Sequence, residues 1–152
     1  MIQYKVVDKR RKSGSVISSA FQLVDGFFEE FMTEMANEVI KLSPVDTGTY
    51  VTSHNITNEN RASEQPTESS HGKPKNQSPQ SMKSRAASKL AGQINKLDLN
   101  KPVYFSNESI HAKFVEYGSA KNPSMERAVY RTARSRTDLA ASKAFRKVGA
   151  TK

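Results

Sequence analysis

The sequence predicts an α+β fold, in which a small antiparallel β-sheet is packed by a long N-terminal helix and a C-terminal helix. Three observations lead to this prediction. The chain has a long amphipathic stretch from Ser15 to Leu42, three short stretches with the pattern of strands, and a basic helical pattern near its C-terminus. Its 152 residues are the usual size of one domain, so we expect a single domain over residues 1–152.

The three strands are expected at residues 2–7, 47–57 and 101–106. Apolar and polar side chains alternate in the first stretch, which is the pattern of a half-buried strand. The second stretch is rich in threonine and contains Tyr50 and Ile56, residue types that favour strands.

The stretch from Ser15 to Leu42 repeats apolar residues at spacings of three and four, as a helix with one apolar face requires. We interpret this stripe as part of the core or as a contact between subunits. The opposite face carries a line of acidic residues, which we interpret as a solvent-exposed face or, in a ring, as a surface that meets a neighbour's arginines. The acidic residues are Asp25, Glu29, Glu30, Glu34 and Glu38.

The composition changes after the second strand. Within residues 57–80 Ala62 is the only hydrophobic residue, counting Ala, Val, Ile, Leu, Met, Phe, Trp, Tyr and Cys, and prolines occur at positions 66, 74 and 79. Such a segment buries too little apolar surface to offset the entropy of ordering it. We therefore expect a long flexible polar loop over residues 57–80, followed by a helix over residues 81–97.

The C-terminal part is basic. Asn122 is a suitable N-cap and Pro123 a suitable first helical residue, so we expect a helix from there to Val148, with a break between residues 135 and 138. On one continuous helix Arg127, Arg131 and Arg134 share a face. Contact with phosphate groups, pairing with an acidic ring and a plain solvated face all remain open for these arginines.

Two short stretches join these elements. In Ser43–Tyr50, Pro44 ends the first helix, Asp46 and Thr47 favour a turn, and Gly48 tolerates backbone angles that other residues avoid. The second stretch, residues 106–119, follows the third strand, makes a helical turn and ends at Gly118.

Taken in this order, the two stretches resemble the neck or tail-completion family of long-tailed bacteriophages. The resemblance covers about residues 15–56 and 101–135, and the chain departs from the family pattern at Thr49, Tyr50, His54 and His111. The residues that carry the resemblance are Pro44, Asp46, Thr47, Gly48, Asn107, Ala112, Glu116 and Gly118.

This resemblance implies a structural virion protein that is made in the host cytoplasm and ends in the tail or neck. Several copies, typically six, would form a ring at the head-proximal end of the tail and join it to the head connector, with the polar loop 57–80 as a docking arm. The implied partners are further copies of the chain, tail tube or terminator proteins and head-connector proteins. DNA would pass through the ring without specific binding, and no membrane partner is expected. The candidate partner or subunit contacts are Arg127, Arg131, Arg134, Glu30 and Glu34.

We expect no cofactor, no metal and no catalytic residue. Cysteine is absent, and the three histidines lack the spacing of a helical zinc motif. An enzyme in which Asp46 and Glu116 form an acid–base pair is our third hypothesis. We interpret Asp46 instead as binding turn amides, and Glu116 as pairing with a basic side chain or capping a backbone group.

The net charge leaves a second hypothesis open. The chain has 24 Lys and Arg against 15 Asp and Glu, a formal charge of +9, which favours an acidic partner. A small basic nucleic-acid-binding protein is therefore the alternative function, supported by the run Lys9–Lys12 and by the C-terminal arginines. The sequence contains no apolar run long enough to cross a membrane and no signal-peptide pattern, so we expect a soluble protein.

Overall fold

The computed structural model describes residues 2–6, 18–45, 48–60, 77–121 and 126–150. Several sequence predictions lie outside these residues: the turn residues Asp46 and Thr47, the basic run Lys9–Lys12, most of the polar loop, and the expected helix start at Asn122 and Pro123.

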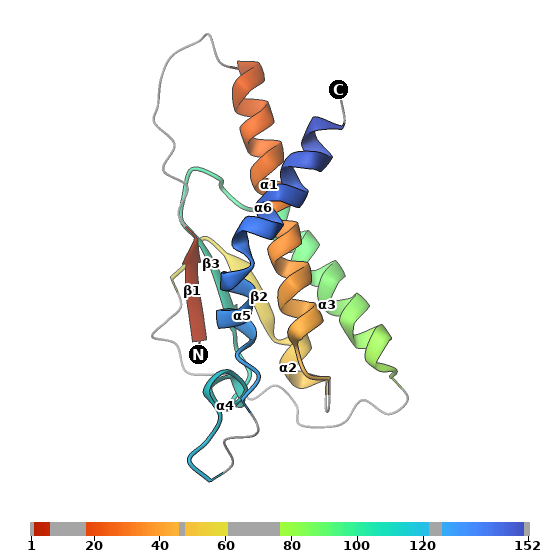
Figure 1. Ribbon diagram of the computed structural model, residues 1–152, viewed down its shortest axis with the longest axis vertical. Coiled ribbons are helices and arrows are strands. Elements are labelled where there is room, and N and C mark those ends of the chain that lie inside the picture. The colour runs from red at the N-terminus through yellow and green to blue at the C-terminus, as the bar shows by residue number, and fades with distance from the viewer. Residues whose placement is uncertain (1, 7–17, 46–47, 61–76, 122–125, 151–152) are drawn as a thin grey trace.

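The structure confirms the α+β fold (Figure 1). Nine elements follow one another along the described residues. They are β1 (Ile2–Val6), α1 (Ser18–Leu42), α2 (Thr49–Thr52), β2 (His54–Thr57), α3 (Pro79–Ile94), β3 (Val103–Asn107), α4 (Ala112–Tyr117), α5 (Val129–Ser135) and α6 (Thr137–Gly149).

The three strands form one antiparallel sheet in the order β1-β3-β2. The central strand β3 pairs Phe105 with Tyr4 of β1 on one side and with Ile56 of β2 on the other. Cross-strand partners share a face of the sheet, so these three apolar residues form one apolar face. The sheet therefore places the N-terminal strand β1 next to β3, which lies between β1 and β2.

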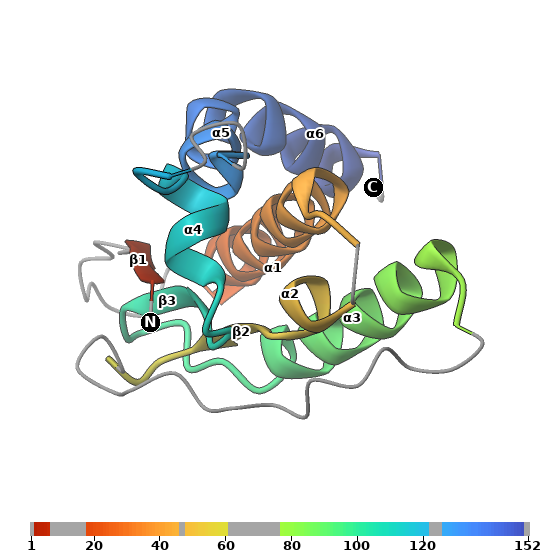
Figure 2. The same ribbon diagram turned by 90° about the horizontal axis from the view of Figure 1, so that it is seen from below.

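Helix α1 is the centre of the molecule. Figure 2 shows it between the sheet and the pair α5 and α6, with α3 beside it on the side of the sheet. Met32 and Val39 of α1 are buried completely or almost completely, and Phe105 and Ile56 lie in the same core cluster. The predicted apolar stripe therefore forms the core along the C-terminal half of α1, because helices and sheet cover it there.

The predicted strand over residues 47–57 is wrong in its first half. Gly48 has a left-handed φ of 77°, and the chain then makes the single helical turn α2 before β2 begins at His54. The hydroxyl groups of Thr52 and Ser53 donate hydrogen bonds to the carbonyl oxygens of Gly48 and Thr49, at 2.8 and 2.6 Å. These local bonds, together with the burial of Tyr50, outweigh the strand preference of the threonines.

The predicted start of the C-terminal helix is also wrong. Residues 126–128 are not helical, and Ala128 has a left-handed φ of 47° immediately before α5 begins at Val129. The backbone N–H of Arg127 donates to the carbonyl oxygen of Val115, at 2.7 Å, which ties this segment to α4 instead. The expected break is confirmed, since α5 ends at Ser135 and α6 begins at Thr137.

The other boundaries move by a few residues. Helix α3 starts at Pro79 because the side chain of Ser78 accepts a hydrogen bond from the backbone N–H of Ser81, at 3.1 Å, and proline fits the first helical position. The two ends of the expected loop 57–80 thus belong to β2 and α3. Strand β3 runs from Val103 to Asn107, two residues later in start and one later in end than predicted.

Candidate functional site

The two short stretches that carry the family resemblance, Ser43–Tyr50 and residues 106–119, meet at the side chain of Asn107. Its amide nitrogen donates to the carbonyl oxygen of Tyr50, at 2.9 Å, and its amide oxygen accepts from the backbone N–H of Ser109, at 2.9 Å. The second bond makes a turn after β3 that leads into α4. Asn107 therefore joins the start of the second stretch, residues 106–119, to α2, which begins inside the first stretch.

His54 lies beside Asn107 in a buried hydrogen-bonded cluster. Its Nε2 is 2.7 Å from the hydroxyl oxygen of Ser43, and its Nδ1 is 2.7 Å from the hydroxyl oxygen of Tyr130 and 3.0 Å from the amide nitrogen of Asn107. The Ser43 hydroxyl already donates to the carbonyl oxygen of Val39, at 2.6 Å, so it accepts from His54. The imidazole is therefore the neutral form with its proton on Nε2.

The surroundings of His54 keep it neutral. Burial and, to a smaller extent, the positive charge of Lys89 lower the pKa of His54 from 6.5 to about 3. The ring lies edge-on to Tyr50 and Tyr130, with centroids 5.1 and 5.5 Å away. His54 thus connects the end of α1, the sheet and α5 without carrying a charge.

Glu116 of α4 is fully buried and binds the start of α5. One carboxylate oxygen accepts from the backbone N–H of Tyr130 and the other from that of Arg131, both at 2.9 Å. The second oxygen also lies 3.2 Å from the hydroxyl oxygen of Tyr4 and 3.5 Å from Nε of Arg131. The expectation that Glu116 caps backbone groups and pairs with a basic side chain is confirmed.

Tyr4 connects this carboxylate to the sheet. Its ring stacks on that of Tyr130 with a centroid distance of 4.9 Å. Burial, the hydrogen bond with Tyr117 and the charge of Glu116 raise the pKa of Tyr4 above its ordinary value. The hydroxyl group therefore stays protonated and donates to Glu116, which holds β1, α4 and α5 together.

This cluster holds the fold rather than presenting groups to a ligand. His54, Asn107 and Glu116 are each no more than 1% exposed. Each has its hydrogen-bonding atoms occupied by neighbours within the chain, and the proposed partner of Glu116 in acid–base chemistry, Asp46, lies outside the described residues. Gly118 ends α4 with a left-handed φ of 70°, and Ala112 is buried at the start of that helix.

Glu34 and Glu38 of the acidic line of α1 face the basic side of α6 in the same chain. The expectation of a solvent-exposed face is therefore wrong for these two residues, whereas Glu29 is exposed as expected. Glu34 and Glu38 are buried, and Nη1 of Arg136 donates to Oε2 of Glu38 at 2.8 Å. This hydrogen bond, more than the other charges nearby, lowers the pKa of Glu38. The remaining pairs join Lys143 to Glu34 and Glu38, at 3.6 and 3.7 Å, and Lys147 to Glu30 and Glu34, at 3.0 and 2.8 Å.

The arginines expected on one helical face do not share one. Arg127 precedes α5, whereas Arg131 and Arg134 lie on it. Arg131 pairs with Glu116 and with Glu126. The side chains of Arg127, Arg131 and Arg134 are all exposed to solvent, so the ion pairs of Arg131 do not bury it.

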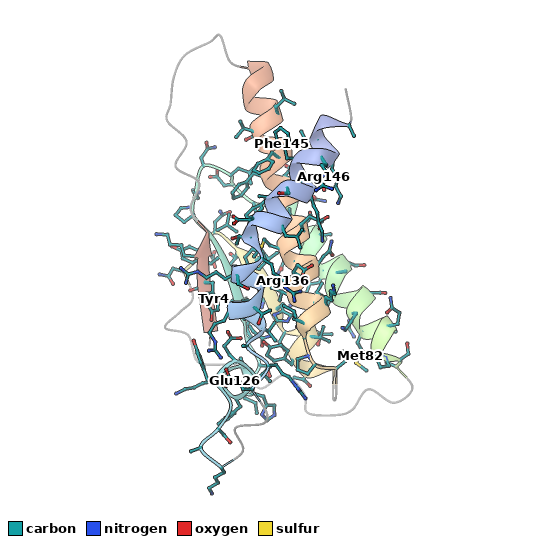
Figure 3. The ribbon with its side chains drawn as sticks, viewed as in Figure 1. Tyr4, Met82, Glu126, Arg136, Phe145 and Arg146 are labelled. Carbon is teal, nitrogen blue, oxygen red and sulfur yellow. The ribbon has the colours of Figure 1, made fainter. Side chains whose placement is uncertain are left out.

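An exposed apolar surface lies at the far end of the α1–α6 pair, which Figure 1 shows extending beyond the sheet. Leu23 and Val24 of α1 are about two-fifths exposed, and Phe145 of α6 is 72% exposed. Together with Phe27 and Val148 they surround a hollow of about 390 Å³. We call this set the α1–α6 end surface. Figure 3 shows Phe145 and its neighbour Arg146 near this end of α6.

Sequence reasoning missed several of these features for different reasons. The amphipathic pattern includes Val24 and Phe27 but does not tell which part of the stripe another helix covers. In the sequence, His54 was notable only as a departure from the family pattern, and its partner Tyr130 is 76 residues away.

Among the described helices, none is long and apolar enough to cross a membrane. The described residues also contain no group of three or more His, Cys, Asp or Glu side chains arranged to hold a metal ion.

Comparison of the chain with protein-family models, with curated proteins and with solved structures finds no match.

Proposed function

We propose that this chain is a structural subunit of the neck of a tailed bacteriophage, where several copies, typically six, form a ring that joins the tail to the head connector. In this role the chain makes and breaks no covalent bond. Its partners are further copies of itself, the tail tube or terminator proteins and the head-connector proteins, and DNA passes through the ring without specific binding.

The α1–α6 end surface is the observation that carries this proposal. A large aromatic side chain that is 72% exposed, next to a hollow lined by apolar residues, is costly in water and is typical of a protein–protein contact. It lies at the tip of two helices that extend away from the sheet (Figure 1), where a neighbouring subunit has access to it.

The signature residues support the proposal in another way. Asn107 and Glu116 are buried where α2, β3, α4 and α5 meet, and Gly48 and Gly118 have the backbone angles that their turns require. A protein whose function is to present surfaces to its neighbours needs a rigid arrangement of these elements. The shared residues of such a family would then maintain the scaffold, while the contact surfaces vary with the partner.

The deciding experiment uses a phage that lacks only this chain and is complemented with variants of it. Electron microscopy of the lysate should show filled heads apart from tails, or tails of abnormal length, and the wild-type chain should restore joined particles. Phe145→Asp should fail to restore them, whereas Arg146→Asp, a change at the neighbouring exposed position, should succeed. Normal joined virions in the absence of the chain would overturn the proposal.

A deletion tests the docking arm within this proposal. Asn58 donates to the carbonyl oxygens of Asp98 and Pro102, at 3.0 and 3.1 Å, and the carbonyl oxygen of Glu59 accepts from Gln3, at 3.2 Å, so the deletion should begin after these contacts. Removing residues 61–76 should leave the unfolding midpoint close to that of the full chain while abolishing head–tail joining. Unimpaired joining by a folded deletion variant would exclude the docking role.

Nucleic-acid binding is the second candidate function, and the exposed face of α4 favours it. Phe114 and Tyr117 are about half exposed, and the guanidinium of Arg131 lies 5.2 Å from the centroid of the Tyr117 ring. Lys113 and Lys121 are exposed nearby in the sequence. Aromatic faces with cations are the groups on which bases stack and phosphates bind.

The intramolecular ion pairs weigh against this second candidate. Arg131, Arg136, Lys143 and Lys147 all pair with glutamates of the same chain, which reduces the positive charge available to phosphate groups. A labelled single-stranded oligonucleotide distinguishes the two functions. A nucleic-acid-binding protein should bind it with an affinity that falls steeply with salt and is weakened by Tyr117→Ala, whereas a neck subunit should bind it weakly at physiological salt.

A further inference from the structure

A second hollow, of about 460 Å³, lies beside the edge strand β1. Its apolar lining comes from α1, β3 and α5, and includes Phe31, Met35 and Phe105. The volume is within the range of about 300–1,000 Å³ that is typical of ligand sites. We call this hollow the β1 cleft.

The geometry of β1 places the cleft along the edge of the sheet. Three consecutive residues, Gln3, Tyr4 and Lys5, line it. Successive side chains of a strand point to opposite faces, and Lys5 lies 5.9 Å from the ring of Tyr104, its cross-strand partner, whereas Tyr4 stacks on Tyr130 under the helices. A cleft bordered by both faces of β1 therefore runs past the edge of the strand.

That edge has no partner strand in the described part of the chain. The sheet order is β1-β3-β2, so β3 occupies only one side of β1. The N–H and C=O groups on the outer side are the kind of groups that bind an added strand.

The charge beside the cleft is positive. Lys5 and Arg134 line it, and among the described residues no aspartate or glutamate does. Neither cation forms an ion pair with another described residue, in contrast to the four basic residues between positions 131 and 147 that pair with glutamates. An apolar floor with two cations beside it complements a ligand that carries both an apolar side chain and carboxylates.

We propose that the β1 cleft binds an extended acidic segment of a partner protein, which pairs with the outer edge of β1 as a fourth strand. The alternation of a strand places an apolar side chain of the segment over Phe31 and Met35, while carboxylates beside it pair with Lys5 and Arg134. This binding site is separate from the α1–α6 end surface, and it does not depend on the proposed ring.

The test measures the binding of a fluorescein-labelled peptide that alternates glutamate with leucine to the full-length chain, by fluorescence anisotropy. The peptide should bind, and the backbone amide resonances of β1 should shift on binding. A peptide of the same charge with proline at alternate positions cannot form the strand hydrogen bonds and should not bind. A peptide with lysine in place of glutamate should not bind either.

Two matched variants locate the site. Arg134→Glu should weaken binding by about tenfold or more, since it removes a charge-assisted hydrogen bond and adds repulsion. Arg146→Glu changes the charge equally on the exposed part of α6, and should leave the affinity unchanged. Because the side chain of Arg134 is exposed, the variant should fold, and circular dichroism checks this.

Several results would overturn the proposal. They are the absence of binding by the alternating peptide, equal binding by the proline-containing peptide, and equal effects of the two arginine variants. Displacement of the peptide by a single-stranded oligonucleotide, with a similar loss on Arg134→Glu, would assign the cleft to nucleic acid instead. None of these results bears on head–tail joining, which is tested through Phe145.

Discussion

Acidification from pH 7 to pH 5 should destabilise this protein through one buried residue, His54. In the unfolded chain its imidazole has the ordinary pKa of 6.5, whereas burial lowers the pKa to about 3 in the folded protein. Between these values the unfolded chain binds a proton that the folded chain does not. The stabilisation is therefore fully present above pH 6.5 and is lost as the pH falls from 6.5 towards 3.

The magnitude follows from the interval that is titrated. Each pH unit in this window changes the free energy of unfolding by about 1.4 kcal/mol, so the fall from pH 6.5 to pH 5 costs about 2 kcal/mol. Urea unfolding at pH 7, 6 and 5, at constant ionic strength, should show the midpoint moving down by about 1 M, for a denaturant slope of about 2 kcal/mol/M. The pH range stops at 5 because carboxylates such as Glu38 contribute below it.

Two controls assign the effect to His54. The pH slope should disappear in His54→Gln, although this variant is less stable at every pH, and it should persist in His111→Asn, a change at an exposed histidine. NMR of the wild-type side chains gives a test that needs no variant. The resonances of His54 should not titrate between pH 7 and pH 5, and a midpoint near 6.5 for this residue would refute the reasoning.

Three further predictions concern single contacts, each measured by urea unfolding. Glu116→Ala should lower the free energy of unfolding by about 3 kcal/mol or more, because it leaves two backbone N–H groups and the Tyr4 hydroxyl without their acceptor. Glu116→Gln should lower it by less. Gly48→Ala should lower the free energy of unfolding by about 2 kcal/mol, because φ is 77° and the added Cβ would clash with Sδ of Met82. In contrast, Gly26→Ala should raise the free energy of unfolding by up to about 1 kcal/mol, because Gly26 lies inside α1 with open space around it. Glu38→Gln should cost about 1–2 kcal/mol through loss of its pairs with α6, and an unchanged midpoint would exclude a stabilising role for those pairs.

Much of the fold follows from local pattern. The spacing of apolar residues predicts α1, the alternation over residues 2–7 predicts β1, and Gly48 and Gly118 mark the two turns with left-handed backbone angles. These features are predictable because they depend on residues that are close in sequence. The carboxylate of Glu116 was also correctly expected to cap a backbone group.

The failures occur where distant residues decide the local structure. Thr49–Thr52 has the composition of a strand, but burial of Tyr50 and the hydroxyl bonds to the preceding turn make it helical. The start of α5 depends on Glu116, whose carboxylate binds the N–H groups of Tyr130 and Arg131 from another helix. Propensity within the segment contains no information about such a partner.

The sequence by itself determined the α+β class, the amphipathic character of α1, the two turns and the positive charge, because composition, periodicity and glycine position are local properties. Only the tertiary structure decided what each surface meets. It turned Glu34 and Glu38 of α1 towards α6, buried His54 among groups from three elements, and left Phe145 exposed. The physical reason is that burial and ion pairing depend on which elements pack together, and this packing is set by contacts between residues far apart in the chain.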